Sequence, residues 1–416
     1  MERELDSILK VNDLFCGAGG MGLGFKYAGF RLAGAWDFDK WAVESYGQNV
    51  SPKVKLSDIT NMTFDELPYA DVWTFGFPCQ DISVAGKQAG MIKNKTRSGL
   101  FYEVMRLLDE TRTNKPTNLP KIILAENVKA VSKYLAEIER EYELAGYKMY
   151  SIMYNSKFWG VPQNRERYFI VGVREDLSSV FKFPKQDESY VPKLSTVLED
   201  DVPDKYFISS EKAKAIIDQA LKRIDKLDQV HATITPDRVN KRQNGRRAKE
   251  NEQEMFTLTS QDLHGIIYLA NCNPSGRDMN GKVYFEEGIS PTLTTNKGEG
   301  IKVMVTGGYS QKRGFTPSDI SNTSDASYYK GLGCNQTRAA VMELAPEYRV
   351  RKLTPREYAR LQGFPESFEF TVSDSQLYKQ FGNAVTVGVA YAIAASIKGF
   401  LLGADAMYGD YKEELT

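Results

Sequence analysis

The chain has 416 residues, 42% of them hydrophobic, which is enough for two or three domains with a sizeable core. Lys and Arg together number 54, the same as Asp and Glu together. This balance argues against a protein that coats nucleic acid non-specifically, but it permits a local basic patch. The four cysteines are scattered without metal-ligand spacing, and the two histidines cannot form a histidine-rich site, so we expect no metal. No apolar run approaches the ~18 residues of a membrane span, and no signal peptide is present, so we expect a cytoplasmic protein without a membrane partner.

Short apolar runs alternate with helical patterns in the first half of the chain. Alternation of this kind predicts a mostly parallel sheet with helices on both faces, an α/β fold. We expect strands at residues 11–15, 30–36, 71–75, 121–125 and 168–173, and helices at 100–110 and 131–144.

The character of the sequence changes near Pro184. Residues 186–348 are rich in Gly, Asn, Thr, Ser and charged residues and lack the strand–helix rhythm, so we expect a second, irregular domain there. Beyond it, residues 354–362 predict a helix with Pro355 in its first turn. Residues 385–402 are apolar and rich in alanine, and we expect them to form a helix that packs on the first domain.

A glycine-rich loop, Cys-Gly-Ala-Gly-Gly-Met-Gly-Leu-Gly, follows the first predicted strand at residues 16–24. Glycines let the backbone approach a ligand, and the N–H groups that open the next helix face that ligand. The loop fits the dinucleotide pattern G-x-G-x-x-G, so a nicotinamide enzyme is one interpretation. An S-adenosylmethionine site uses the same geometry, with the methionine end of the cofactor near Gly17 and Gly19.

Acidic residues follow two of the later apolar segments. Asp37 ends the second predicted strand, 20 residues after Gly17, where an acid suits the two hydroxyls of a ribose. Asp58 and Ile59 follow a third apolar region and suit an adenine, with the acid on the exocyclic amine and the isoleucine on the ring face. For each acid alone, a solvated surface position is an equally good interpretation.

Residues 76–83 read Gly-Phe-Pro-Cys-Gln-Asp-Ile-Ser and follow a strand that we expect to be buried. Pro78 fixes its own φ and favours an extended Phe77, so Cys79 is held at the carboxyl end of a strand. Ligands of open α/β sheets bind at that edge, which makes Cys79 a candidate nucleophile. A lone cysteine is more often a small buried hydrophobe, and the rest of the chain decides between these interpretations.

Glu126 follows the predicted strand at 121–125 and belongs to the same sheet edge as Cys79. The two groups suggest chemistry on cytosine, because a thiolate added to C6 makes C5 enamine-like if N3 gains a proton or a strong hydrogen bond. A glutamic acid whose pKa is raised by burial supplies that bond.

A cysteine nucleophile also needs local positive charge, because a free thiol with a pKa near ~8.5 is only slightly ionised at neutral pH. Arg165 and Arg167 of the segment Gln-Asn-Arg-Glu-Arg (163–167) provide that charge. An arginine there also suits the O2 of cytosine, although a solvated pair at a strand start is the alternative.

Taken together, six motifs form an ordered set that closely resembles the DNA (cytosine-5)-methyltransferases, especially the bacterial restriction-modification type. The resemblance covers residues 11–175 and 350–400. It implies a Rossmann-like class I S-adenosylmethionine-dependent methyltransferase domain with a second, irregular target recognition domain. The motifs are Asp-Leu-Phe-Cys-Gly-Ala-Gly-Gly (13–20), Gly-Phe-Pro-Cys-Gln (76–80), Glu-Asn-Val (126–128), Gln-Asn-Arg-Glu-Arg (163–167), Arg-Glu-Tyr-Ala-Arg-Leu-Gln-Gly (356–363) and Gln-Phe-Gly-Asn-Ala-Val (380–385).

The resemblance implies methyl transfer from S-adenosylmethionine to C5 of a flipped-out cytosine in a specific double-stranded DNA sequence. The implied catalytic domain comprises residues 1–185 plus 375–416, and the implied target recognition domain comprises 186–374. The implied catalytic residues are Cys79, Glu126, Arg165 and Arg167, with Glu126 on N3 and the amino group of cytosine and Arg167 on O2. The implied cofactor-binding residues are Phe15, Gly17, Gly19, Asp37, Asp58, Ile59, Pro78, Asn383 and Val385, the last two returning from the C-terminal segment to close the site.

Three groups of residues are expected to bind DNA, two of them implied by the resemblance and one by the local charge of the sequence. A mobile loop at 80–100 closes over the cytosine and carries Gln80, Ser83 and Arg97. A stretch at 238–249 holds six basic residues and no acid, which suits phosphate contacts through residues such as Arg242 and Arg246, although a solvated loop is the alternative. The family's Thr-Leu pair corresponds to Thr292-Leu293 or, through an internal echo, to Thr257-Leu258, and we favour the later pair.

Rival interpretations come from three other protein classes. A nicotinamide oxidoreductase leaves the cysteine turn, Glu126 and the arginine pair without a purpose. A tRNA cytosine methyltransferase shares the fold and mechanism, but the long variable region favours double-stranded DNA. A catalytically dead DNA-binding relative conflicts with the presence of Cys79, Glu126 and Arg167. We expect a monomer that protects DNA beside a separately acting restriction endonuclease, or a solitary relative.

Overall fold

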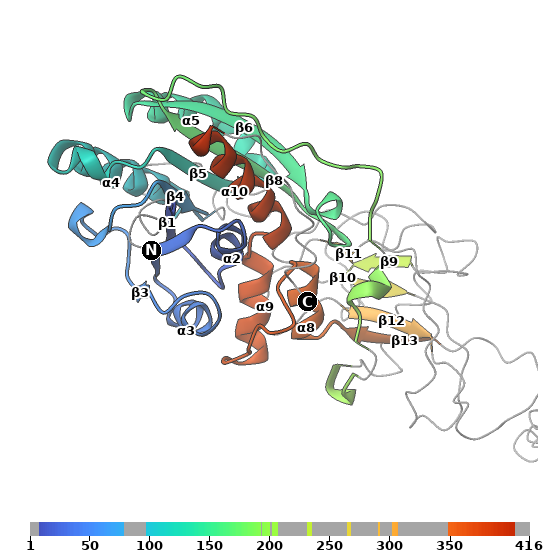
Figure 1. Ribbon diagram of the computed structural model, residues 1–416. Helices are drawn as coiled ribbons and strands as arrows, with labels where there is room; N and C mark the ends of the chain where they lie inside the picture. Colours follow the sequence, from blue (N-terminus) through green and yellow to red (C-terminus); the bar gives the residue numbers. More distant parts are fainter. Residues whose placement is uncertain are drawn as a thin grey trace, which may run out of the picture.

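The computed structural model describes residues 8–78, 97–192, 194–199, 202–206, 231–234, 264–267, 290–291, 302–306 and 348–403. Its centre is a seven-stranded sheet (Figure 1). The strands are β1 (Lys10–Leu14), β2 (Arg31–Asp37), β3 (Val54–Leu56), β4 (Val72–Phe75), β5 (Ile122–Val128), β6 (Tyr147–Asn155) and β8 (Glu166–Arg174).

The strands of this sheet lie in the order β3-β2-β1-β4-β5-β8-β6. The first five are parallel, and β8 runs antiparallel to both of its neighbours. All four residues of β4 are buried, as expected for a central strand covered on both faces. The predicted mostly parallel α/β sheet is therefore confirmed, and the antiparallel β8 is a feature that the apolar runs did not predict.

Helices cover both faces of the sheet (Figure 1). On one face, α2 (Gly20–Tyr27) and α10 (Val387–Leu402) share a hydrophobic cluster that includes Phe25 and Ile393. On the other face, α4 (Phe101–Asn114) and α5 (Leu135–Leu144) pack together, with the rings of Phe101 and Tyr142 stacked 6.2 Å apart. The other α-helices of the described residues are α3 (Lys40–Asn49), α8 (Pro355–Leu361) and α9 (Asp374–Asn383). The 3-10 turns are η1 (Phe64–Glu66), η2 (Arg97–Leu100), η3 (Pro116–Asn118), η4 (Lys129–Tyr134), η5 (Ser156–Phe158), η6 (Leu194–Val197) and η7 (Asp204–Tyr206).

The apolar helix α10 is the element that the sequence predicted to pack on the first domain. Most of its residues are buried, and it ends at Gly403, which adopts the left-handed conformation typical of a helix C-terminus. Within the described ranges, no single helix is long and apolar enough to cross a membrane. The pair α9 and α10 meets that test only when taken together, and the two helices are bent by 42° from each other.

A second, smaller sheet has the order β13-β12-β10-β9. Its strands are antiparallel except for the pair β10 and β12. A short strand β11 (Ser290–Pro291) pairs instead with β7 (Gln163–Asn164), which lies just before β8. The strands of the second sheet are β9 (His231–Ile234), β10 (His264–Ile267), β12 (Lys302–Thr306) and β13 (Tyr348–Lys352).

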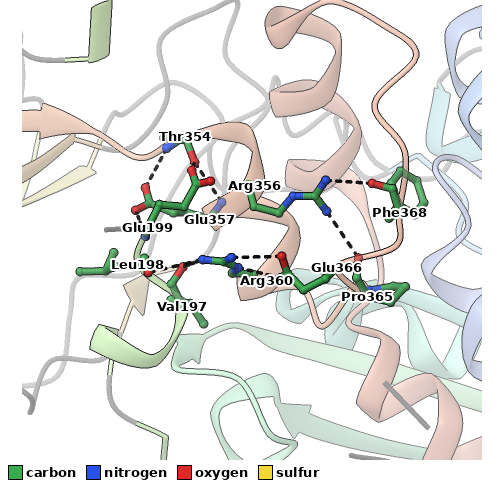
Figure 2. Close-up of polar contacts among 10 residues, drawn as sticks. All are labelled: Val197, Leu198, Glu199, Thr354, Arg356, Glu357, Arg360, Pro365, Glu366 and Phe368. Carbon is green, nitrogen blue, oxygen red and sulfur yellow. Dashed lines mark hydrogen bonds and ion pairs between the residues drawn. The ribbon is translucent and has the colours of Figure 1, made fainter. Parts of the chain in front are cut away.

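The chain passes from β13 into α8 through a polar junction, which Figure 2 shows in close-up. Thr354 is the N-cap residue just before α8, and the Glu357 carboxylate accepts its backbone N–H at 2.8 Å. The Glu199 carboxylate accepts the Thr354 hydroxyl, and the Glu199 backbone N–H donates to Glu357 at 2.8 Å. Arg360 donates to the carbonyls of Val197 and Leu198 at 3.3 and 3.4 Å. The segment at 197–199, which leads into the second region, is therefore hydrogen-bonded to the first turns of α8, where the chain returns from that region.

This junction bears on the predicted domain limits, in which residues 186–374 form the second domain. Leu353, Tyr358 and Phe368 lie in the same hydrophobic cluster as Phe25 of α2 and Ile393 of α10. The segment that precedes α9 is thus packed with the core of the first region. The limits 1–185 plus 375–416 and 186–374 stay a prediction.

Candidate active site

The carboxyl ends of β1, β2, β4 and β5 meet at one edge of the sheet, because these strands are parallel. The strand order reverses between β1 and β4. In open α/β sheets, ligands bind in the crevice outside such a switch point. The structure brings the predicted residues Phe15, Asp37, Pro78 and Glu126 to this edge.

The glycine loop is tied to the end of β2. Phe15 has φ +53° and Gly17 has φ +54°, and the left-handed conformation is uncommon for a bulky residue such as Phe15. The Gly17 backbone N–H donates to Asp37 Oδ2 at 2.9 Å, and the Cys16 N–H donates to the Trp36 carbonyl at 3.1 Å. Backbone strain of this kind persists only where the surroundings enforce it, and it clusters at functional sites.

The glycines of the loop have two different roles. A Cβ at Gly19 would lie 2.5 Å from Val50 Cγ2, and one at Gly20 would lie 2.1 Å from the Val385 carbonyl oxygen. A Cβ at Gly17 would meet no atom within 4 Å. The sequence predicted glycines that let the backbone approach a ligand. Gly17 fits that expectation, whereas Gly19 and Gly20 are required by close packing inside the protein.

Asp37 is 9% exposed, and both of its carboxylate oxygens accept backbone N–H bonds, from Gly17 and Asp39, at 2.9 Å each. Burial raises the pKa of Asp37, and the two N–H bonds oppose that rise. Asp39 in turn accepts from the N–H of Trp41 at the start of α3 and forms an ion pair with Lys379 of α9 at 2.6 Å. A carboxylate has about four acceptor positions, so Asp37 has capacity for two hydroxyl donors as well as the loop.

Asp58 lies just beyond β3 and is exposed. Its Oδ1 accepts from the backbone N–H and the hydroxyl of Thr60 at 3.0 and 2.8 Å. Ile59 is only 6% exposed and packs in the core cluster with Trp36. Its carbonyl accepts from Arg106 of α4 at 3.0 Å, which fixes the turn. Both residues lie at the expected edge, and their contact with an adenine stays a prediction.

Phe38 is a candidate that the sequence reasoning missed. Its side chain is 71% exposed and directly follows Asp37. The neighbouring Trp41 is covered by the ammonium group of Lys40, 4.5 Å from the ring centroid. A large exposed aromatic ring beside a ribose-type acid offers a flat apolar surface for a purine. In the sequence, the feature that could have identified Phe38 is its position directly after Asp37, the acid that ends the strand.

Cys16 is a free, buried cysteine in the same loop. Burial raises the pKa of its thiol well above the ordinary value, and the carboxylates of Asp13 and Asp37 raise it further. The thiolate, not the thiol, is the nucleophile, so Cys16 is chemically unsuited to that role.

The turn that leads to Cys79 is anchored on β5. Phe77 is 3% exposed, and its carbonyl accepts from the side-chain amide of Asn127 at 2.9 Å. The Asn127 Oδ1 accepts from the backbone N–H of Val128 at 2.9 Å, which fixes the orientation of the amide. Pro78 follows at the edge of the described range. Asn127 is thus a further positioning residue that the sequence did not single out.

Glu126 and Arg167 face each other at the same edge. The Arg167 Nε lies 3.2 Å from Glu126 Oε1, and their side chains are 16% and 10% exposed. A Cβ at Gly76 would lie 3.4 Å from Glu126 Oε2, so the carboxylate lies over the start of the cysteine turn. Burial raises the pKa of Glu126, whereas the charges of Arg167 and Arg165 lower it. A carboxyl group shifted in this direction is suited to hydrogen-bond donation.

Arg165 lies apart from this pair. It is 2% exposed, and its guanidinium donates to the carbonyls of Gly382 and Ala384 at 3.2 and 2.9 Å. Asn383, between these two residues, is exposed at the end of α9, and Val385 lies against Gly20. The structure therefore brings the C-terminal segment to the glycine loop, as predicted, and directs the Arg165 guanidinium to the backbone of that segment.

Several predicted site residues lie outside the described residues. They are Cys79, Gln80, Ser83, Arg242, Arg246, Thr257, Leu258, Thr292 and Leu293. Arg97 is described only as the first residue of η2. In the part of the chain that the structure describes, no cluster of His, Cys, Asp or Glu is arranged to hold a metal ion.

Comparison with known proteins identifies the family. Residues 9–399 match the C-5 cytosine-specific DNA methylases. The orphan methyltransferase M.SPRI of Bacillus phage SPR is 30% identical over 92% of this chain and 96% of its own length. The type II methyltransferase M.FnuDI of Fusobacterium nucleatum is 31% identical over 94% of each chain. The fold is that of the S. pombe Dnmt2 methyltransferase structure, with a TM-score of 0.55 at 18% identity over 94% of this chain and 98% of that one. The chain therefore belongs to the C-5 cytosine-specific DNA methylase family and is a DNA (cytosine-5)-methyltransferase.

Proposed function

We propose that this DNA (cytosine-5)-methyltransferase takes its methyl group from S-adenosylmethionine and uses Cys79, Glu126 and Arg167 to activate a flipped-out cytosine. The observation that carries the proposal is the buried Glu126–Arg167 pair at the carboxyl end of β5, over the turn that leads to Cys79. The glycine loop lies at the same sheet edge, so one crevice serves the methyl donor and the base.

The residues at the end of β1 and β2 fit S-adenosylmethionine, which supplies an electrophilic methyl group when bound. A Cβ at Gly17 would meet no atom within 4 Å, which leaves room for a ligand beside the loop, and Asp37 has acceptor capacity for two ribose hydroxyls. The exposed ring of Phe38 offers a surface for the adenine, and Asp58 lies at the neighbouring strand end. We assign Phe15, Gly19, Ile59, Pro78, Asn383 and Val385 to the surrounding wall.

The chemistry on cytosine begins with the Cys79 thiolate. Its sulfur forms a bond to C6, and the electron pair of the C5–C6 double bond becomes available at C5. Glu126, whose pKa is raised by burial, supplies the proton or hydrogen bond to N3, while Arg167 donates to O2. C5 would then form a bond to the methyl carbon while the bond from that carbon to the sulfonium sulfur of the donor breaks, so the donor would leave as S-adenosylhomocysteine. Loss of the C5 proton to a base restores the double bond and expels the thiolate, so the enzyme is regenerated.

The second region would select the DNA sequence. β11, Ser290–Pro291, pairs with β7 directly before Arg165, and Thr292-Leu293 follow β11 in the chain. This supports Thr292-Leu293 over Thr257-Leu258 as the reading element. We assign Arg242 and Arg246 to phosphate contacts, and Gln80, Ser83 and Arg97 to the loop over the extruded base. Extrusion costs a few kcal/mol, which these contacts offset.

We also propose that the protein acts as a monomer on double-stranded DNA in the cytoplasm. Its relatives include both orphan and type II methyltransferases, so protection of DNA beside a separate endonuclease and solitary methylation are both represented among them. S-Adenosylmethionine is the only small-molecule substrate that the proposal requires.

The test is expression in a host that lacks DNA methylation, followed by bisulfite sequencing. We expect modified cytosines at one short sequence with the wild-type protein, and far fewer modified copies of that sequence with Glu126→Gln. The matched control is Glu166→Gln, a partly exposed neighbour on β8 that pairs with Lys129, and it should retain methylation. Methylation at the wild-type level in Glu126→Gln would contradict the role of Glu126, and a wild-type protein that modifies no cytosine would contradict the proposed function.

A further inference from the structure

Arg165 is the most deeply buried arginine near the site, and its guanidinium contacts a distant part of the chain. It lies between β7 and β8 and is 2% exposed. Its Nη1 donates to the Gly382 carbonyl at 3.2 Å and its Nη2 donates to the Ala384 carbonyl at 2.9 Å. A buried charge is costly unless it is hydrogen-bonded, so these carbonyls and Arg165 depend on one another.

The segment that Arg165 holds is the one that covers the glycine loop. The Val385 carbonyl lies so close to Gly20 that a Cβ there would be 2.1 Å away. The same segment is held by Thr386, whose hydroxyl is hydrogen-bonded to Ser156 at 2.8 Å and to Gln362 at 2.9 Å. Residues 382–386 are therefore fixed between α2 on one side and the β6–β8 connection on the other.

Arg165 is also adjacent to the base-binding pair. It lies two residues before Arg167, whose Nε contacts Glu126 at 3.2 Å. The backbone of Arg165 is fixed independently of its side chain, because its N–H donates to Asn155 Oδ1 and its carbonyl accepts from Ser156, each at 3.0 Å. A change of the side chain alone thus leaves the start of β8, and with it Arg167, in place.

We propose that Arg165 is a positioning residue that anchors the cofactor-covering segment 382–385 to the start of β8, beside the base-binding pair Glu126–Arg167. This inference rests on the proposed function, and it replaces the expectation that Arg165 acts on the base. The guanidinium acts through the backbone of the C-terminal segment. Its loss should therefore weaken cofactor binding while the chemistry of Cys79 on cytosine continues.

The experiment compares Arg165→Met and Arg165→Lys with Arg167→Met in the full-length protein. One measurement is the dissociation constant for S-adenosylmethionine without DNA, by calorimetry. The other is exchange of the C5 hydrogen of cytosine in DNA without cofactor, which reports addition of the cysteine alone. For Arg165→Met, we expect cofactor affinity to fall about 10- to 100-fold, the loss typical of hydrogen bonds to a charged group. C5 exchange should stay within about threefold of wild type, and Arg165→Lys should recover part of the affinity.

Arg167→Met should show the reverse pattern, with normal cofactor affinity and little C5 exchange. If Arg165→Met does not fold, Thr386→Val provides the second test, because it removes the bond to Ser156 from the same segment and should give a smaller loss of cofactor affinity. Unchanged cofactor affinity in the folded variants, or an equal loss of C5 exchange, overturns the proposal. Normal exchange in Arg167→Met instead overturns the proposed role of Arg167 and leaves the Arg165 result standing.

Discussion

The two halves of the active-site edge are organised by different physical means. At the ends of β1 and β2, polar side chains bind the protein's own backbone, as Asp37 does with the N–H groups of Gly17 and Asp39. At the ends of β4 and β5, a buried carboxyl group and a guanidinium, Glu126 and Arg167, face each other. The cofactor half is thus preorganised by backbone geometry, and the base half by buried charge. Substitutions in the cofactor half should therefore lower cofactor affinity, whereas substitutions in the base half should lower the reactivity toward cytosine.

The largest effect is expected from Cys79→Ser, in the base half. The serine hydroxyl is a far weaker nucleophile than a thiolate at neutral pH, so methyl transfer should be abolished. Because the cofactor half is organised separately, S-adenosylmethionine affinity should be unchanged in calorimetry. Full activity of the serine variant would remove Cys79 from the mechanism, and a parallel loss of cofactor affinity would contradict the separation of the halves.

Glu126→Gln should lower the rate of methyl transfer by about 100- to 10,000-fold, the usual contribution of a general acid. The amide keeps the shape of the carboxyl group but cannot deliver a proton to N3. Single-turnover methyl transfer with saturating cofactor measures this step. Glu166→Gln is the control on the neighbouring strand, and a similar loss in that variant would show that the effect is not specific to Glu126.

Asp37→Ala tests the cofactor half. It removes a buried acceptor of two backbone N–H bonds as well as the expected ribose contact, so S-adenosylmethionine affinity should fall about 10- to 100-fold. Glu44→Ala, at an exposed position on α3, is the matched control and should bind normally. C5 exchange of cytosine without cofactor should persist in Asp37→Ala. An unchanged dissociation constant would exclude the ribose role.

The smallest effect on methylation is expected at Asp13, in the interior of the cofactor half. Burial raises its pKa from 3.8 to about 7, although hydrogen bonds from Thr74 and Tyr46 oppose the rise. Between these pH values the folded protein retains a proton that the unfolded chain releases. The free energy of unfolding should therefore fall as the pH rises through this window, by about 1.4 kcal/mol for each unit of the pKa difference.

Asp13→Asn removes this titration. Denaturant unfolding at a series of pH values should show a flatter dependence between about pH 4 and pH 7 than in the wild-type protein. Identical slopes in the two proteins would mean that Asp13 is ionised in the folded state.

Five strands of the central sheet, β1, β2, β4, β5 and β8, were predictable because their apolar runs are continuous, whereas their ends were not, and β3 and β6 were not predicted. β5 continues beyond its apolar run through Glu126 to Val128, because Val128 pairs with Arg167 of β8. Glu126 consequently lies within a strand and not after one. The long strand β6 escaped prediction because its burial pattern, Tyr147 to Asn155, is that of a partly exposed edge.

The candidate site was predictable where a residue acts beside its neighbours in sequence. Asp37, Glu126 and Arg167 reach the expected edge because each lies near the end of a strand that the sequence identifies. Arg165 differs, because its partners Gly382 and Ala384 are more than 200 residues away and are contacted through backbone carbonyls. Every residue has a backbone carbonyl, so the residue types at 382 and 384 do not indicate that they accept hydrogen bonds from Arg165. This contact could be identified only from the structure.

The most direct test of the account traps the protein on DNA that carries 5-fluorocytosine in its target sequence. After methyl transfer the fluorine at C5 cannot leave as a proton does, so the sulfur–C6 bond persists. This trap requires both halves, because it forms only after the base is activated and the methyl group has been transferred. We predict a covalent complex that depends on S-adenosylmethionine, with the adduct mapped to Cys79 by mass spectrometry. An adduct on the buried Cys16, or no adduct from an active preparation, would contradict the account.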